Sequence, residues 1–335
     1  MDKVARMLVA GRRRYPRAAK SFPLAQALFA VAIFVAVSGK VLAETPDTKL
    51  DFARQFDMGA GRKLFLECRG AAPAGYPTVV LISGYYGSSD AWTEIELSPL
   101  AVGPAVLPGL ARENRVCAYD RPGTLRAMAD APLTDRSTPV AQPRTVRDLV
   151  SELHGLLSAA QVPTPYVLVG HSLGGLIALL YARTYSSDVR GIVFVDALSP
   201  TMPIQLGALW PLYLGVLNPP LQDQPVPSLR QPESERVDID ASIDQVRQAL
   251  PLPPMPLAVL TRSEPTQFPS LPAGITGAAI DTAFGNAQRY FVELVPTTPQ
   301  VFATGSGHNI QESQPDLVIN ATRLVIGRAA AASTK

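Results

Sequence analysis

The chain has 335 residues, of which 47% are hydrophobic and 17% are charged, and its formal net charge is +2. This size and apolar content suit one large α/β domain with an insertion, and they exclude an intrinsically disordered chain. Because Lys and Arg are concentrated near the N-terminus, the remaining chain is mildly acidic, which argues against nucleic acid as a partner.

Residues 1–43 have the pattern of a secretory signal peptide. A basic start, rich in Arg, precedes an apolar stretch centred on residues 27–37 and a small-x-small pattern at 41–43. We expect cleavage before Glu44 and export of the protein, which would be periplasmic or secreted. The alternative is an uncleaved membrane anchor, although the apolar stretch is short for a membrane span. A cleaved chain would keep no stable membrane span.

The rest of the chain alternates strand and helix patterns. Residues 54–58 and 62–68 flank a Gly-Ala-Gly turn and predict a hairpin. Short buried strands are predicted at 78–82, 115–119, 166–169, 191–195, 256–260 and 300–304. Helices are predicted at 144–160, 176–181 and 316–328. This alternation predicts an α/β fold with a mostly parallel central sheet and helices on both faces.

A glycine-rich turn separates the strand at 166–169 from the helix that follows it. The turn reads Gly-His-Ser-Leu-Gly from Gly170 to Gly174, with Ser172 at its centre. Side chains at the two glycines would clash in so sharp a turn, and Ser172 would stand clear of the sheet at a helix N-terminus. Free N–H groups and the helix dipole favour a developing negative charge there. The turn therefore predicts a nucleophilic serine; the alternative is an ordinary glycine-rich turn.

Residues 197–255 interrupt the alternation. They are rich in proline, carry Trp210 and Tyr213 among apolar residues, and include an acidic stretch at 233–244. A crossover between two strands needs far fewer residues. We interpret the segment as a cap over the active site; the alternative is a poorly ordered surface insertion. The predicted core is then 44–196 followed by 256–328, with a short tail at 329–335.

Six short motifs together resemble the α/β-hydrolase superfamily, and they look most like its exported bacterial members. They are Cys68-Arg69-Gly70, Ser83-Gly84, residues 116–123 (VCAYDRPG), residues 170–175 (GHSLGG), Val195-Asp196-Ala197 and residues 305–308 (GSGH). The resemblance runs from about Phe52 to Arg328 without the cap, and it implies the α/β-hydrolase fold with Ser172 on a nucleophile elbow. One departure is Ser83-Gly84, where family members often carry His-Gly.

A serine nucleophile needs a base within hydrogen-bond reach and a third group that orients this base. The chain has 3 histidines. His171 neighbours the nucleophile, so its side chain should point away from Ser172, and His154 reads as a solvated histidine on a helix. His308 lies in a glycine-bounded loop after the last predicted strand, where the superfamily places its base. We therefore expect His308 to be the base.

The acid has two candidates. Asp196 ends the strand after the elbow, a position that some superfamily members use, and the order Ser172, Asp196, His308 fits the family. The commoner position follows the next strand, where Glu264 stands. Asp196 is the preferred candidate. An aspartate there can also be structural, since hydrolases with their acid elsewhere often keep one.

The resemblance also implies an oxyanion hole and a disulfide. One backbone N–H would come from Leu173, directly after the nucleophile, and the other from Tyr85, in the loop after the third strand. Cys68 and Cys117 are the only cysteines. They would lie on neighbouring strands of the superfamily's sheet and in an oxidising compartment, which allows a disulfide. The alternative is two buried thiols.

These residues predict a serine hydrolase that cleaves carboxylic esters through an acyl-enzyme. The sequence has no His/Cys cluster with metal-ligand spacing and no phosphate-binding glycine loop, so we expect no metal and no cofactor. The expected partner is a small-molecule ester with an apolar part. The alternatives are an acyltransferase or amidase with the same triad, or a non-catalytic exported binding module with the same fold.

Overall fold

A computed structural model describes residues 51–95, 101, 103–268 and 270–333 of the chain. Within them the strands are β1 (Phe52–Asp57), β2 (Lys63–Arg69), β3 (Thr78–Ile82), β4 (Val116–Tyr119), β5 (Tyr166–His171), β6 (Val189–Val195), β7 (Leu257–Arg262) and β8 (Gln300–Ala303). The helices are α1 (Val106–Leu110), α2 (Val146–Ala159), α3 (Leu173–Thr184), α4 (Met202–Leu206), α5 (Trp210–Leu217), α6 (Ile239–Gln248), α7 (Gly277–Glu293), α8 (Ile310–Ser313) and α9 (Pro315–Ser333).

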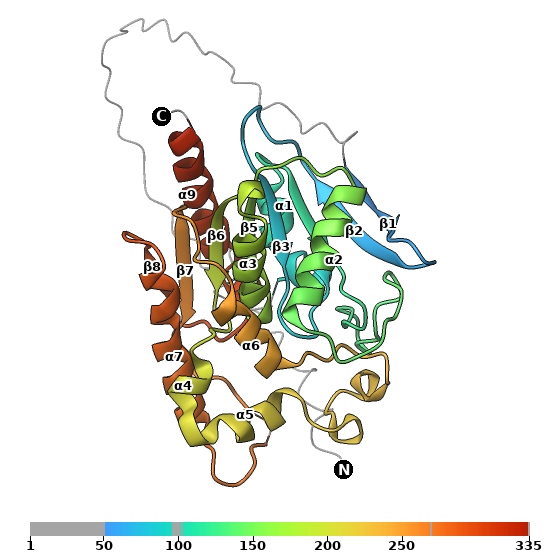
Figure 1. Ribbon diagram of the computed structural model, residues 1–335, viewed down its shortest axis with the longest axis vertical. Coiled ribbons are helices and arrows are strands. Elements are labelled where there is room, and N and C mark those ends of the chain that lie inside the picture. The colour runs from blue at the N-terminus through green and yellow to red at the C-terminus, as the bar shows by residue number, and fades with distance from the viewer. Residues whose placement is uncertain (1–50, 96–100, 102, 269, 334–335) are drawn as a thin grey trace, which may run out of the picture. The chain divides into compact units, whose positions relative to one another are not determined.

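The strands form one sheet of eight in the order β1-β2-β4-β3-β5-β6-β7-β8 (Figure 1). The β1–β2 hairpin pairs antiparallel, as does β2 with β4, and every later pair is parallel. The predicted α/β-hydrolase fold is thus confirmed, and the strands lie close to their predicted positions. Cys68 and Cys117 face each other across β2 and β4, and a disulfide joins them.

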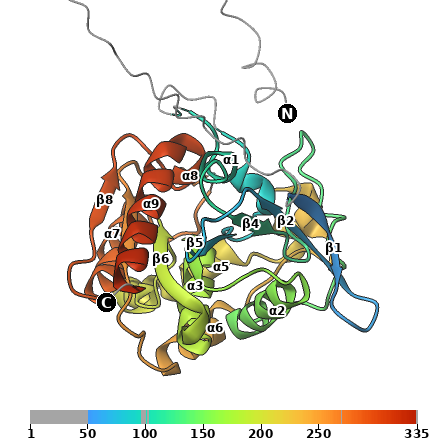
Figure 2. The same cartoon turned by 90° about the horizontal axis from the view of Figure 1, so that it is seen from above.

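Helices cover both faces of the sheet, because its central strands are apolar on both sides (Figure 2). Along β3, Val79 and Leu81 belong to the core shared with α1 and α9, whereas Val80 and Ile82 belong to the core shared with α2, α3 and α7. Successive side chains of a strand point to opposite faces, so one short apolar run serves both cores. The two cores hold the carboxyl ends of the parallel strands in place.

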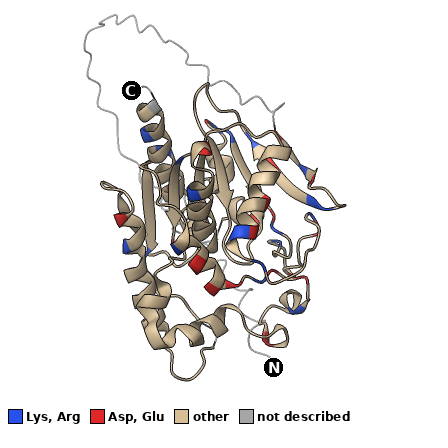
Figure 3. Ribbon diagram, in the orientation of Figure 1, with Lys and Arg blue, Asp and Glu red and all other residues tan. Residues whose placement is uncertain are grey.

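The insertion at 197–255 folds into α4, α5, α6 and short 3₁₀ turns, and Figure 1 shows α4 and α5 beyond the carboxyl ends of β5, β6 and β7. Pro203 and Pro211 stand in the first turns of α4 and α5, where proline fits the helix without losing a hydrogen bond. Neither α4 nor α5 carries a charged residue (Figure 3). This apolar surface faces the end of the sheet where the predicted site residues lie.

The sequence pattern predicts only the helices α2, α3 and α9, and α9 is longer than predicted. No helix was predicted for α7, whose internal Gly285 and polar residues weaken the pattern, although packing of Ile280 and Phe284 stabilises it. The C-terminal helix α9 continues through the alanine-rich segment predicted as a tail and ends at Ser333. The predicted signal peptide lies outside the described residues. Within the described part of the chain, no helix combines the length and apolar character that a membrane span needs.

Candidate active site

Ser172 occupies the sharp turn between β5 and α3, with φ of 52° and ψ of −120°. This backbone conformation is strained for a residue with a side chain. Neighbouring backbone leaves no space beside it: a Cβ on Gly170 would lie 2.4 Å from Gly174 O, and one on Gly174 would lie 2.1 Å from Ile82 O. The turn therefore has the geometry expected from the motif, and Ser172 lines a pocket at the carboxyl edge of the sheet.

His308 follows β8, and its Nδ1 lies 2.6 Å from Oδ2 of Asp196 at the end of β6. Asp196 is fully buried, whereas His308 is half-buried and lines the same pocket as Ser172. Among the described residues, no hydrogen bond joins the Ser172 hydroxyl to His308. In a free enzyme such a contact commonly tightens only when substrate binds. The three residues therefore meet at one edge of the sheet.

Glu264 does not reach His308. Its side chain is exposed and accepts a hydrogen bond from the Ser263 hydroxyl at 3.2 Å, while its backbone N–H donates to Ser306 O at 3.0 Å. Both carboxylates follow neighbouring strands, but only the Asp196 side chain turns toward the loop after β8. The structure thus brings Asp196, and not Glu264, to His308.

Arg262 is a site residue that the sequence analysis missed. It ends β7, its side chain is 7% exposed, and its Nη1 donates to Asp196 Oδ2 at 2.5 Å. Its Nη2 donates to Asp281 at 2.7 Å, and its guanidinium lies 4.4 Å from the centre of the Phe284 ring. A charged residue at the buried end of an apolar strand is the signal that could have found it.

The surroundings keep Asp196 ionised. Burial alone would raise the pKa of this carboxyl group, but the hydrogen bond from His308 and the charge of Arg262 hold the pKa below its usual value. The carboxylate can therefore accept a hydrogen bond from the Nδ1–H of His308 and fix the orientation of the imidazole ring. Arg262 also forms an ion pair with Asp281. The cluster therefore contains two carboxylates and one guanidinium in addition to the imidazole of His308.

His171 lies between the two loops that carry site residues. Its Nε2 is 3.0 Å from the backbone oxygen of His308, and a Cβ on Gly84 would lie 2.8 Å from its Nδ1. Burial lowers the pKa of His171 to about 3, so the ring is neutral and can donate its Nε2 proton to that carbonyl. Through this hydrogen bond, His171 stabilises the backbone of the loop that carries His308.

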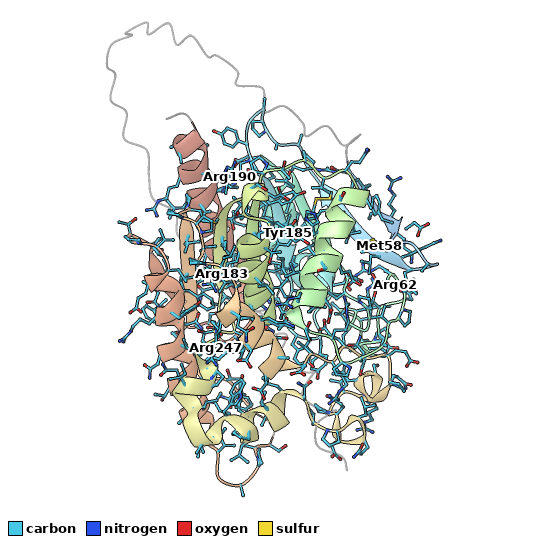
Figure 4. The ribbon with its side chains drawn as sticks, viewed as in Figure 1. Met58, Arg62, Arg183, Tyr185, Arg190 and Arg247 are labelled. Carbon is cyan, nitrogen blue, oxygen red and sulfur yellow. A yellow bond between two sulfur atoms is a disulfide. The ribbon has the colours of Figure 1, made fainter. Side chains whose placement is uncertain are left out.

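His154 lies away from the site. It is half-buried on α2 and stacks at 3.7 Å on the ring of Tyr185, at the end of α3 farthest from Ser172 (Figure 4). Its Nδ1 is 3.2 Å from the Tyr181 hydroxyl. The expectation of a freely solvated histidine was therefore incomplete, because the helix packs one side of the ring against α3.

The two backbone N–H groups expected to form an oxyanion hole are those of Leu173 and Tyr85. Leu173 begins α3, where helix N–H groups have no partner within the helix, and Tyr85 lies in the loop after β3. Both residues line the pocket with Ser172. Within the described residues, neither backbone N–H donates to a protein acceptor. Both groups are thus available to a bound carbonyl oxygen.

Mostly apolar side chains complete the pocket, which encloses about 150 Å³. The core and α7 supply Arg262, Thr266, Phe268, Ile280 and Phe284, and the insertion supplies Leu198, Tyr213, Leu217 and Ile239. Residues of the insertion therefore form part of the wall opposite Ser172. In the described part of the chain, no group of three or more His, Cys, Asp or Glu side chains is arranged to hold a metal ion.

Comparison with known proteins agrees with this architecture. The sequence profile of the Alpha/beta hydrolase family matches residues 79–321. The chain belongs to this family. The fold class expected from the sequence motifs is thus confirmed at the family level.

Proteins related in sequence align with only part of this chain. An uncharacterized protein of Schizosaccharomyces pombe is 32% identical over 149 residues, which are 40% of this chain and 26% of the relative. RutD of Escherichia coli, a proposed carbamate hydrolase, is 35% identical over 120 residues, which are 36% of this chain and 37% of RutD. The chain thus spans well under half of the length of both relatives.

Solved structures align with most of this chain. A thermophilic esterase from Thermogutta terrifontis matches with a TM-score of 0.52 and 18% identity, covering 83% of this chain and 99% of the esterase. A bromoperoxidase from Bacillus anthracis matches with a TM-score of 0.54 and 18% identity, covering 82% of this chain and 100% of that protein. At such low identity these likenesses concern the fold alone.

Proposed function

We propose that the hydrolase cleaves carboxylic esters through a covalent acyl-enzyme, with Ser172 as nucleophile, His308 as base and Asp196 as acid. The observation that carries this proposal is the hydrogen bond from His308 to buried Asp196, in a pocket that Ser172 also lines. A serine hydroxyl needs such a base, and the base needs such an orienting carboxylate.

The proposed reaction has two halves. His308 accepts the Ser172 hydroxyl proton as Oγ attacks the ester carbonyl carbon, and the N–H groups of Leu173 and Tyr85 bind the resulting oxyanion. The carbon–oxygen ester bond then breaks, and His308 returns the proton to the leaving alcohol. Water, deprotonated by His308, attacks the acyl carbon; the bond from this carbon to Ser172 Oγ breaks, His308 returns the proton to Oγ, and the acid is released. Asp196 holds the imidazole in the required tautomer and stabilises its charged form.

The pocket favours a small apolar group on the substrate. A space of about 150 Å³ is large enough for one benzene-sized group, and its walls are mainly aliphatic and aromatic. The similarity to RutD favours including aryl carbamates beside aryl esters in a substrate screen. Amide hydrolysis or acyl transfer by the same residues would appear as product from an amide, or as transfer to an added alcohol.

The test is covalent labelling together with kinetics. A fluorophosphonate should add its mass to the peptide that carries Ser172, and Ser172→Ala should abolish both labelling and turnover of p-nitrophenyl acetate. His308→Ala should cost nearly as much, and the double variant little more, because the two residues act as a unit. Near-normal activity of purified, folded Ser172→Ala would rule the mechanism out. A wild type that neither labels nor turns over would favour the binding-module alternative.

A matched pair of substitutions tests the acid. Asp196→Asn should lower kcat by roughly four decades, because an amide neither orients the His308 imidazole correctly nor stabilises its charged form. Glu264→Gln changes a carboxylate after the neighbouring strand, whose exposed side chain does not contact His308, and should leave kcat within about twofold. The opposite ranking would make Glu264 the acid and Asp196 a structural residue.

A further inference from the structure

A buried ion pair lies behind the loop that carries the Tyr85 N–H. Arg121 follows β4, Glu235 belongs to the insertion, and their side chains are 1% and 2% exposed. Burial alone would lower the pKa of Arg121, but Glu235 raises it, so the guanidinium stays charged. A buried pair of this kind adds little net stability compared with apolar residues. Its other hydrogen bonds therefore matter more than the pair itself.

The remaining hydrogen bonds of the pair go to the loop itself. Arg121 donates from Nη1 to Ser83 O at 2.9 Å and from Nη2 to Gly84 O at 2.6 Å. Glu235 Oε2 accepts from the Tyr86 N–H at 2.8 Å. The pair therefore forms hydrogen bonds with backbone groups on both sides of Tyr85.

The Arg121 contact to Gly84 O orients the Tyr85 N–H, together with the Gly87 N–H, which donates to the same oxygen at 3.0 Å. The Gly84 carbonyl and the Tyr85 N–H belong to one peptide unit, which is planar and trans, so the two groups point in opposite directions. Fixing the carbonyl on Arg121 therefore fixes the N–H on the other side of the same plane. The N–H of Tyr86, held by Glu235, restrains the next peptide unit.

The insertion also holds the side chains of this loop. The Tyr85 hydroxyl donates to Asn218 and accepts from the Val237 N–H, the latter at 2.8 Å. The Tyr86 hydroxyl donates to Leu217 O at 3.2 Å, and the two tyrosine rings stack with centroids 4.0 Å apart. Groups from the core and from the insertion thus converge on the loop that carries Tyr85.

We propose that Glu235 is a positioning residue for the oxyanion hole: through Arg121 and the Tyr86 N–H, this insertion residue orients the Tyr85 N–H. The insertion then does more than cover the pocket, because without Glu235 one of the two oxyanion donors is no longer held in place. The inference rests on the proposed function of Ser172.

The kinetic consequence is specific. An oxyanion donor binds the transition state rather than the ester itself, so its misplacement lowers kcat and leaves KM nearly unchanged. Loss of one donor typically costs two to three decades in kcat. Because Glu235→Gln keeps the shape and one acceptor, we expect kcat to fall by about 10- to 100-fold, with KM within about threefold.

The experiment compares Glu235→Gln with Glu233→Gln, whose side chain is exposed two positions away. Steady-state kinetics on p-nitrophenyl acetate are paired with inhibition by phenylboronic acid, whose tetrahedral serine adduct places an oxygen in the oxyanion hole. Near-UV circular dichroism and thermal unfolding report whether each variant is folded. The expected result is a parallel loss of kcat and of boronic acid affinity in Glu235→Gln, with Glu233→Gln equal to wild type.

A folded Glu235→Gln with the kcat and boronic acid affinity of Glu233→Gln would overturn the inference. If Glu235→Gln does not fold, Glu235→Asp replaces it, since the shorter side chain keeps the charge but withdraws the carboxylate from Arg121 and the Tyr86 N–H; an unchanged kcat and affinity there would also overturn the inference. A wild type that neither turns over ester nor labels at Ser172 would instead overturn the proposed function, and the inference with it.

Discussion

At the scale of single residues, the site depends on groups whose charge state is set by burial. Asp196 is kept ionised by its neighbours, whereas His171 is kept neutral. The titratable and charged side chains around His171 are His308, Asp196 and Arg262, of which the Asp196 carboxylate favours the protonated form of His171. Neutral His171 supports the backbone of His308, so protonation of His171 should loosen the site.

The His171 prediction concerns the free energy of unfolding. The unfolded histidine binds a proton below about pH 6.5, and the folded one only below about 3. Between these values the unfolded state binds more protons, so this contribution to stability is lost as pH falls. Urea unfolding should show wild type more stable than His171→Asn at pH 7, with the difference shrinking by about 2–3 kcal/mol at pH 4.5. A difference that does not change with pH would contradict this account.

At the scale of elements, the antiparallel end of the sheet is cross-linked. Cys68 of β2 and Cys117 of β4 are register partners with 0% exposure, and their disulfide closes a loop with a sequence separation of 49. The segment enclosed by the disulfide contains β3 and the loop after it, which carries Tyr85. A cross-link of this kind reduces the freedom of the unfolded chain and so favours the folded sheet.

The disulfide prediction has a chemical and an energetic part. Titration of denatured, non-reduced protein should find no free thiol, and the Cys68→Ala/Cys117→Ala variant should lose about 2–5 kcal/mol of unfolding free energy. Reduced wild type is the matched control, because it lacks the cross-link but keeps both side chains. Two titratable thiols in the non-reduced protein would contradict the pairing.

At the scale of the whole molecule, we propose that the hydrolase is exported. Residues 1–43 support this by their basic start, apolar stretch and cleavage pattern, and the disulfide supports it because such bonds persist in oxidising compartments.

The measurement is N-terminal sequencing of protein recovered from each cell fraction. Protein recovered outside the cytoplasm should begin at or near Glu44. A membrane-bound chain that keeps Met1 would favour the anchor instead, and a full-length chain found in the cytoplasm would contradict export. A chain whose apolar stretch is interrupted by two Asp residues is the control, because it should stay in the cytoplasm uncleaved.

The sequence by itself determined the features that depend on local pattern. Apolar strands alternating with amphipathic helices specify a parallel sheet between helices, and the glycines around Ser172 specify the turn because no other residue fits there. The prediction of His308 as base rested on the resemblance to the superfamily, which places its base in the loop after the last strand. These features need only residues that are neighbours in the chain.

Only the tertiary structure decided how side chains from distant segments meet. Asp196 and Glu264 both follow strands that end at the same edge of the sheet, and only side-chain direction distinguishes them. The local pattern does not show which residues Arg262 and Glu235 pair with, because their partners lie 66 and 114 positions away along the chain. Such pairs form when folding brings remote backbone together and burial removes each charge from water.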